Sequence, residues 1–431
     1  MDFSIIFQKI PQALSATINY YRYGPPQPSW NLKLYLIFKI IKGEFGSTNN
    51  QTIEDVQKMY MANTTPVNGV LVDELLLPNS LRKESEVYID DILKDYNHVL
   101  VDDWRSVNIG NGLELINYRL SPQNQFPAAL HDSITAYNYL IDPPKDADFL
   151  PVDPKNIVIM GESAGGGLTM ATLLAIRNST KSLPLPAGAV VWSAWVDLAK
   201  TTQSIKDPSL DELDYISDEP FHYATSPAWE EFEQKAKELS EKIQLNIDNK
   251  PKFWHKSFDR DGRLQLYASN EGLAIPYVSP LFAESLGGLP PILVQTGDIE
   301  KFRDESIYLA HKAANPEKYN LPYYNAEKFK KSPYKTSTKV VLEVYEEMPH
   351  VFQIFGDIHP SPQIAVNRTT EFIKRLLSGE EEEKGFKALR VTAKGEIIEG
   401  LKKEHYETLE WENIGVVPSS TRKVYSIKPD N

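Results

Sequence analysis

The stretch Ile157-Val158-Ile159-Met160-Gly161-Glu162-Ser163-Ala164-Gly165 decides the fold. Four apolar residues of strand length precede a Gly-x-Ser-x-Gly pattern, and a helix-compatible run, 168–176, follows it. This is the layout of a strand-to-helix turn that projects a serine. We expect such a strained turn to leave no room for side chains two positions before and after Ser163, which explains Gly161 and Gly165.

The same turn predicts an anion site beside the serine. The helix that follows would aim its N-terminus, and the backbone N–H of Ala164, at negative charge developing near Ser163 Oγ. Gly165 or Gly166 would give clearance around that point. A five-residue pattern also occurs by chance, so the prediction depends on its position between a strand and a helix.

Composition narrows the class of protein. The 431 residues suffice for one large α/β domain with additions, or for two domains. The hydrophobic content of 41% supports a substantial core, and the net charge of −13 argues against nucleic acid as a partner. The chain has no cysteine, which excludes disulfides, thiol catalysis and cysteine metal sites.

Apolar runs of strand length alternate with helix-like stretches along the chain. The strand-like runs are 113–116, 157–160, 189–192, 292–295 and 340–345. The helix-like stretches are 127–141, 168–176, 304–314 and 364–377. This alternation predicts the α/β class, with a mostly parallel sheet and helices on both of its faces.

The alternation is interrupted in three places, which suggests additions to a core at 96–378. Residues 1–95 read as a helical segment that contributes to a cap. An insertion at about 206–274 reads as the cap itself, with an ordinary surface excursion as the alternative. It contains a serine N-cap followed by proline and apolar residues at helical spacing, namely Ser226, Pro227, Trp229, Phe232, Ala236, Leu239 and Ile243. Residues 379–431 form a C-terminal extension that starts with an acidic, solvated run, 380–383.

The N-terminus lacks the basic start and continuous apolar core of a signal peptide. Its most apolar run, 32–41, is too short to span a bilayer and carries two lysines. We interpret this run as a packed helix, or alternatively as an interfacial segment that contacts a membrane or lipid droplet. The expected location is therefore intracellular, either cytoplasmic or peripherally membrane-associated.

A serine nucleophile needs a base, and the base needs a carboxylate to orient it. His350 follows the strand-like run 340–345 on a proline-containing loop and is the preferred base, while His359 is the alternative. The acid should follow 292–296, where position allows Asp298 or Glu300; both could instead be simple loop charges. His311 falls within a helix and is expected at the surface.

Taken together, these residues resemble the hormone-sensitive-lipase-type branch of the α/β-hydrolases, in particular its fungal esterases. The resemblance covers about 113–377. It is carried by Tyr118-Arg119-Leu120-Ser121-Pro122, Phe126-Pro127-Ala128-Ala129 with Asp132, Gly161 to Gly167, Trp195-Val196-Asp197-Leu198, Ser279-Pro280-Leu281, Pro290 to Glu305 and Met348-Pro349-His350-Val351-Phe352. Glu162 replaces the usual aspartate of the family's serine motif.

The resemblance implies an α/β-hydrolase fold with a helical cap and hydrolysis of a small-molecule ester or lipid through an acyl-serine, with neither cofactor nor metal. Ser163, Glu300 and His350 would be the catalytic residues. Glu300 is preferred to Asp298 because the family's acid stands four positions before an Asp-Glu pair, which is Asp304-Glu305 here.

The sequence also departs from the family. We find no His-Gly-Gly-Gly segment, whose N–H groups supply most of the family's oxyanion hole. Three explanations compete: a missing exon, replacement by 99–102 with Gly110 and Gly112 as donors, or loss of catalysis with retention of the pocket. The leading hypothesis is a serine carboxylesterase or lipase acting on acetyl or short- to medium-chain acyl esters. The alternative is a catalytically impaired relative that binds a small apolar ligand.

Overall fold

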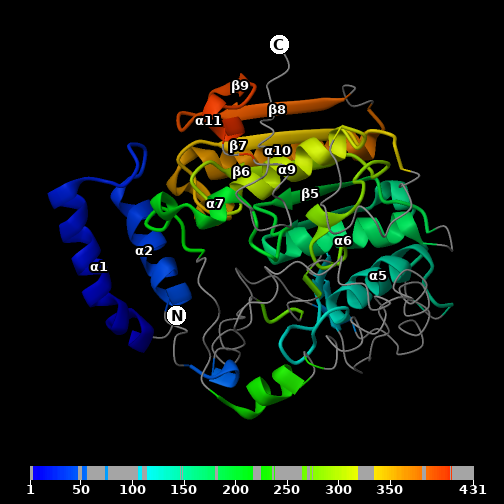
Figure 1. Cartoon of the computed structure of the whole chain (residues 1–431), viewed down its shortest axis with the longest axis horizontal. Helices are drawn as coiled ribbons and strands as arrows, with labels where there is room; N and C mark the ends of the chain where they lie inside the picture. The colour runs from blue at the N-terminus through cyan, green and yellow to red at the C-terminus, as the bar shows by residue number, and fades with distance from the viewer. Residues whose placement is uncertain are drawn as a thin grey trace, which may run out of the picture.

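A sheet of six strands forms the centre of the computed structural model, in the order β4-β5-β6-β7-β8-β9 (Figure 1). Their bounds are β4 Val158–Glu162, β5 Gly188–Trp192, β6 Ile292–Gly297, β7 Val340–Tyr345, β8 Phe386–Val391 and β9 Ile397–Glu399. Strands β4 to β8 are parallel, and β9 is antiparallel to β8. The described residues are 3–46, 51–55, 73–75, 105–108, 114–145, 147, 149–179, 183–216, 225–234, 237, 265–268, 272–273, 275–318, 334–380, 385–407 and 409.

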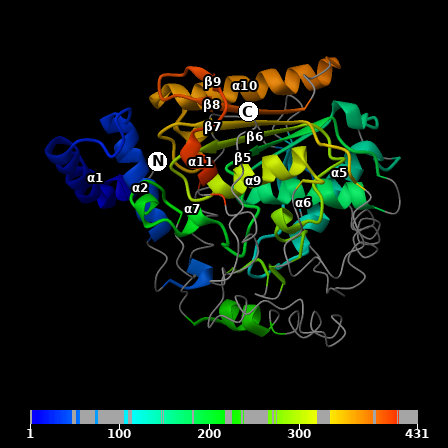
Figure 2. The same ribbon diagram turned by 45° about the horizontal axis from the view of Figure 1, so that its top comes forward.

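Helices cover both faces of this sheet, as the alternation predicted. Helices α5 (Ala128–Ile141), α6 (Ala164–Asn178) and α9 (Arg303–Ala314) lie on one face, and α10 (Pro360–Ser378) lies on the other (Figure 2). Successive strand residues point to opposite faces. Val191 and Val294 therefore belong to the cluster with α6 and α9, whereas Val190 and Leu293 pack against Phe372 of α10.

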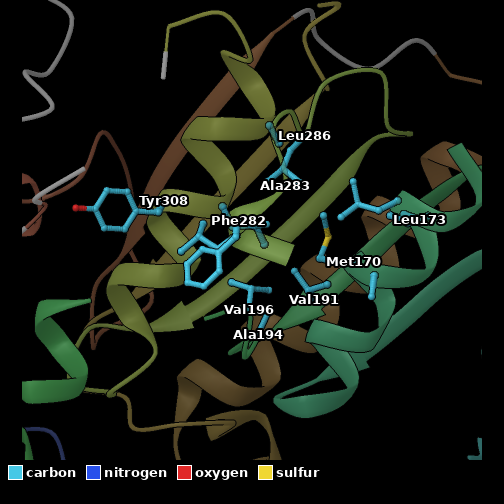
Figure 3. Packing of buried hydrophobic residues seen from close by; sticks show 14 of the residues in the cluster. Met170, Leu173, Val191, Ala194, Val196, Phe282, Ala283, Leu286 and Tyr308 are labelled. Carbon is cyan, nitrogen blue, oxygen red and sulfur yellow. The ribbon is translucent and has the colours of Figure 1, made fainter. Parts of the chain in front are cut away.

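The larger core cluster lies beneath α6 and α9. Figure 3 shows Met170 and Leu173 of α6 beside Val191, with Phe282 and Tyr308 on the other side of the cluster. These side chains are buried, and the short 3-10 helix η6 (Pro280–Phe282) contributes to the same packing. The mostly parallel α/β class expected from the sequence is confirmed.

The expected strand at 113–116 forms, but it belongs to a second, antiparallel sheet. In this sheet β1 (Asp73–Leu75), β2 (Arg105–Asn108) and β3 (Glu114–Asn117) lie side by side. Only residues 109–113 separate β2 from β3, so the two strands can pair only as a hairpin, because parallel neighbours need a crossover of a dozen residues or more. Among the described residues β4 pairs with β5 alone, and Met160 of β4 is 40% exposed.

Two N-terminal helices, α1 (Phe3–Tyr23) and α2 (Leu32–Gly46), pack against one end of the sheet (Figure 1). Leu34 and Phe38 of α2 are buried in a cluster with Trp30 and Tyr215, so the run 32–41 is a packed helix. Helix α1 lies outside α2 and is tied to it by Gln12 Nε2, which donates to the Lys39 carbonyl at 2.7 Å. No helix in the described ranges has the length and apolar content needed to cross a bilayer.

The residues after 378, expected as an extension, add β8, β9 and the short helix α11 (Lys403–Glu407) to the core. Strand β8 pairs with β7 along its whole length, and Val391 is fully buried. The sheet therefore does not end at 378. Glu380 is exposed, and 381–384 lie outside the described residues.

The insertion at about 206–274, expected as a cap, is described only in part. Segments α7 (Gln203–Lys206) and η3 (Pro208–Leu210) are followed, after a gap, by a helix at 227–234. Ser226 Oγ accepts from the Trp229 N–H at 3.2 Å, as expected for an N-cap, and Phe232 is buried. The expected apolar positions Ala236, Leu239 and Ile243 lie outside the described residues.

Candidate active site

Ser163 lies on a sharp turn between β4 and α6. Its backbone has φ 51° and ψ −119°, a conformation that side chains rarely adopt and that indicates stored strain. Three bonds hold this turn: the Ser163 N–H donates to Trp192 O at 2.9 Å, while Ser163 O accepts from Trp195 and Gly167 at 2.9 and 3.1 Å. The half-buried side chain therefore sits at the carboxyl end of the parallel strands.

The glycines around Ser163 are required to different degrees. A Cβ on Gly161 would lie 2.2 Å from the Gly165 carbonyl oxygen, so only glycine fits there. A Cβ on Gly166 would lie 2.9 Å from that of Ala194, and one on Gly167 would lie 2.1 Å from the Trp195 oxygen. At Gly165 no described atom lies within 4 Å of such a Cβ, apart from its chain neighbours and the adjacent backbone of its own helix. The expectation that crowding requires glycine was therefore wrong at Gly165.

Glu300 follows β6 and is fully buried. Its carboxylate accepts from Ser193 Oγ at 2.7 Å, from Thr296 Oγ1 at 2.7 Å and from the Gly297 N–H at 3.0 Å. Burial raises the pKa of Glu300 and nearby Asp214 adds to the increase, whereas the three donors oppose it. All three donors fix the direction in which the carboxylate points.

His350 follows β7 and brings an imidazole to this carboxylate. Its Nδ1 lies 4.0 Å from Glu300 Oε1 and has no hydrogen-bond partner in the described part of the chain. The ring is held edge-on by Phe302 and Tyr215, at centroid distances of 4.9 and 5.6 Å. Burial lowers the pKa of His350 to about 3, which keeps the imidazole neutral and able to accept a proton at neutral pH.

Ser193 links these loops, and no sequence pattern pointed to it. It follows β5, with φ 47°, and its hydroxyl donates to Glu300 Oε2 while accepting from the Val351 N–H at 3.0 Å. The preceding residue, Trp192, accepts from the Ser163 N–H. One short segment thus contacts the serine turn, the acid and the histidine loop.

Asp214 and Tyr215, from the insertion expected as a cap, hold the backbone beside Glu300 and His350. Asp214 Oδ2 accepts from the Lys301 N–H at 2.6 Å, and its Oδ1 accepts from the His350 N–H at 3.3 Å. The Tyr215 hydroxyl donates to the His350 carbonyl. Burial raises the pKa of Asp214 to about 6. The segment that carries Asp214 and Tyr215 is therefore tied to the loops that carry Glu300 and His350.

The other sequence candidates have different environments. Asp298 Oδ2 lies 3.0 Å from Lys402 Nζ, and its Oδ1 accepts from the Glu347 N–H. Its carboxylate therefore connects the loop after β6 to the loop after β7 and to the tail. His359 caps α10 by accepting from the Ser361 N–H. His311, expected at the surface, is buried against Phe386 of β8, because the tail covers α9. The geometry thus favours Glu300 and His350.

Comparison with known proteins agrees with this arrangement of strands and loops. A family model described as alpha/beta hydrolase fold matches residues 113–225 and 221–328, which together span about half of the chain. The chain belongs to the α/β-hydrolase fold family.

Two curated relatives of this α/β-hydrolase have names that refer to ester chemistry. An acetyl-hydrolase of Streptomyces hygroscopicus is 25% identical over 276 residues, which cover 63% of this chain and 67% of the relative. An esterase of Acinetobacter venetianus is 23% identical over 265 residues, which cover 61% of this chain and 63% of the relative. The chain therefore spans about two thirds of the length of each.

Among solved structures, a mutant of the esterase E40 matches 81% of this chain and 99% of its own, at 22% identity and a TM-score of 0.48.

The segment Tyr118-Arg119-Leu120 also has a structural role in this α/β-hydrolase. The Arg119 guanidinium donates to the Asp132 carboxylate of α5 at 2.8 Å, and both side chains are buried.

Within the described ranges no cluster of three histidine or acidic side chains is placed to hold a metal ion.

Proposed function

We propose that this α/β-hydrolase cleaves carboxylic esters through an acyl-enzyme on Ser163. One observation carries the proposal: Ser163 lies on a positive-φ turn between β4 and α6, and Glu300 and His350 lie in the loops after β6 and β7. The names of the acetyl-hydrolase and esterase relatives support ester chemistry.

The proposed reaction has two halves. In the first, Ser163 Oγ bonds the ester carbonyl carbon while His350 Nε2 takes the hydroxyl proton, and the tetrahedral intermediate then expels the alcohol, which receives that proton. In the second, His350 deprotonates a water that attacks the acyl-serine, and the new tetrahedral intermediate releases the carboxylic acid as His350 returns the proton to Ser163 Oγ. Glu300 faces Nδ1 and stabilises the imidazolium formed in each half.

The oxyanion of each tetrahedral intermediate needs donors. The Ala164 N–H, at the start of α6, is the first of them, because a helix N-terminus favours negative charge. We infer that the usual glycine-rich segment is missing, so that a further donor must come from other backbone, such as Gly110 or Gly112, which lie outside the described residues. Loss of one donor typically costs about 10²–10³-fold in rate.

The proposed substrates are small esters with acetyl or short- to medium-chain acyl groups, including lipid-like ones. The aromatic rings of Phe302 and Tyr215 flank His350, and Trp195 stacks on Phe302 at a centroid distance of 5.6 Å. This apolar surrounding suits an acyl chain better than a charged group. We also retain the proposal that the N-terminal segment contacts a lipid surface.

The test is hydrolysis of p-nitrophenyl acetate and butyrate by the full chain and by Ser163→Ala. We expect the variant to lose turnover by about 10⁶-fold, because no other group can form the acyl-enzyme. Its thermal unfolding should match that of the wild type. Equal turnover by the two proteins would refute the assignment of Ser163.

A second candidate is a catalytically impaired α/β-hydrolase that binds a small apolar ligand. The 4.0 Å separation between His350 Nδ1 and Glu300, longer than a hydrogen bond, favours it. This candidate predicts that an apolar ester raises the unfolding temperature without being hydrolysed. Serine-dependent turnover in the first assay would exclude it.

A further inference from the structure

Helix α1 carries an apolar stripe that faces away from the protein. Ile10, Leu14, Ile18 and Tyr21 are exposed by 48%, 59%, 55% and 76%. Their spacing of four, four and three residues places them along one side of the helix, within about 80° of arc. Four large apolar side chains in a row are more than the scattered surface hydrophobics of an ordinary helix.

The opposite side of α1 is already occupied. Ala16 is buried, Tyr20 is half-buried with its hydroxyl donating to the Trp30 carbonyl, and Gln12 is bonded to α2. The exposed polar residues Ser15 and Asn19 lie beyond the stripe on the third side of the helix. Helix α1 thus has a packed side, a polar side and an uncovered apolar side. In both views it forms the outermost layer of the molecule at this end (Figures 1 and 2).

The helical hairpin formed by α1 and α2 differs in charge from the rest of the chain. Residues 3–46 contain five basic side chains and one acidic one, whereas the whole chain has a net charge of −13. Lys39 and Lys42 both pair with Glu212, but Arg22 at the end of α1 and Lys33 at the start of α2 are exposed. An apolar stripe with basic neighbours is the pattern of helices that lie in the interface of anionic membranes.

We propose that α1 docks this protein on an anionic lipid surface, with Ile10, Leu14, Ile18 and Tyr21 inserted at the headgroup boundary. The helix would lie flat in the interface, since it does not span a bilayer. A lipid surface fits better than a protein groove because the stripe is convex and the exposed charged residues described in residues 3–46, Arg22 and Lys33, are both basic in an acidic protein. The run 32–41, predicted from the sequence as the interfacial segment, is instead the packed helix beneath it.

Docking at α1 would also place the catalytic loops close to the surface. Trp30 Nε1, between α1 and α2, donates to the Glu347 carbonyl at 2.6 Å, and the Ser29 N–H donates to the Glu347 carboxylate at 2.7 Å. Glu347 lies three residues before His350. The hairpin that carries the stripe is therefore fixed directly to the histidine loop.

The experiment is flotation of the full chain with phosphatidylcholine vesicles and with vesicles that also contain phosphatidylglycerol. We expect binding to the anionic vesicles, weakened by salt and reduced roughly tenfold or more by the double variant Leu14→Glu, Ile18→Glu. The matched control is Ser15→Glu, Asn19→Glu, which adds the same charge to the polar side of the same helix and should bind more tightly than the stripe variant.

Several results would overturn the proposal. Failure of the wild-type protein to float with either kind of vesicle would contradict it, and so would equal binding by the stripe and control variants. Concentration-dependent dimerisation in gel filtration that only the stripe variant loses would assign the stripe to a second copy of the chain. Hydrolysis of p-nitrophenyl acetate should be unchanged in both variants, because none of the four residues belongs to the proposed catalytic site, so failure of docking and failure of the proposed function are distinguishable.

Discussion

At the scale of residues, two carboxylates of one loop have different partners, Ser193 and His350 for Glu300 and Lys402 for Asp298. We expect Glu300→Gln to lower kcat by about 10⁴-fold, because an amide facing His350 Nδ1 cannot stabilise an imidazolium. Asp298→Asn removes the same charge two positions earlier, where the partner is Lys402. It should lower the unfolding temperature while kcat changes by less than about tenfold. Steady-state kinetics and thermal unfolding of both variants measure this contrast.

The difference in kcat between the two variants decides which carboxylate is the catalytic acid. A larger kcat loss in Asp298→Asn than in Glu300→Gln would transfer the role of catalytic acid to Asp298. If both lost activity only in proportion to unfolded protein, neither carboxylate would be the acid.

Asp214 gives a prediction about pH. Burial raises its pKa from 3.8 to about 6, so the folded state binds the proton more tightly than the unfolded state does. The stability this provides is fully present below pH 3.8 and is lost as the pH rises through 6. Relative to Asp214→Asn, the free energy of unfolding of the wild type should fall by about 3 kcal/mol across that window. Urea unfolding of both proteins over a pH series is the measurement.

The contradicting outcome for Asp214 is a constant difference between the two proteins at every pH. An offset is expected in any case, because the carboxylate accepts from backbone N–H groups and an amide nitrogen cannot. Only the slope of the difference with pH reports the titration.

These residues show where sequence reasoning stops. Ser163 and His350 were predicted because each stands at a fixed place relative to an apolar run. Position alone left Asp298 and Glu300 equivalent, and the resemblance chose between them. Ser193 and Asp214 had no signal, because their contacts join segments more than a hundred residues apart along the chain. Such contacts exist only once the strands are arranged.

At the scale of elements, the turn between β4 and α6 can be tested with two glycines. Gly161→Ala places a Cβ 2.2 Å from the backbone oxygen of Gly165 and should cost about 3 kcal/mol, because neither backbone can move without breaking the turn. Gly165→Ala enters open space in the first turn of α6 and should change stability by less than about 1 kcal/mol. Denaturant unfolding compares them, and equal effects would contradict this account of the turn.

The helices and parallel strands were largely predictable, because a buried strand or an amphipathic helix carries its own periodicity. The pairing of β3 was not. A short apolar run reads the same in a parallel sheet and in a hairpin, and the choice depends on the five residues that separate β3 from β2. Among the described strands β4 pairs with β5 alone, so its other edge has no described strand partner, and β3 has paired elsewhere.

At the scale of the whole molecule, the ends of the chain complete a single structure. Helix α2 packs against the loop that carries His350, and the tail continues the sheet beyond β7. The sequence pattern predicted only an extension there. In β8, Lys387 and Arg390 interrupt the apolar residues, and a half-buried strand of six residues has only a weak hydrophobic pattern. Tyr406 and Leu409, still nearer the C-terminus, belong to the main core cluster.

If the tail is part of that core, then shortening one buried side chain within it must destabilise the entire protein. Val391 of β8 is fully buried, whereas Ile397 of β9 is half exposed. Val391→Ala should lower the free energy of unfolding by about 2 kcal/mol, and Ile397→Ala by less than about 0.5 kcal/mol. Circular dichroism and tryptophan fluorescence should report the same shifted transition. Six of the seven tryptophans lie before β7 and only Trp411 lies in the tail, so the fluorescence reports mainly on the part of the protein outside β8. A Val391→Ala variant whose global transition does not move would mean that β8 unfolds separately, since a cooperative sheet cannot lose buried contacts in one strand without loss of stability in the others.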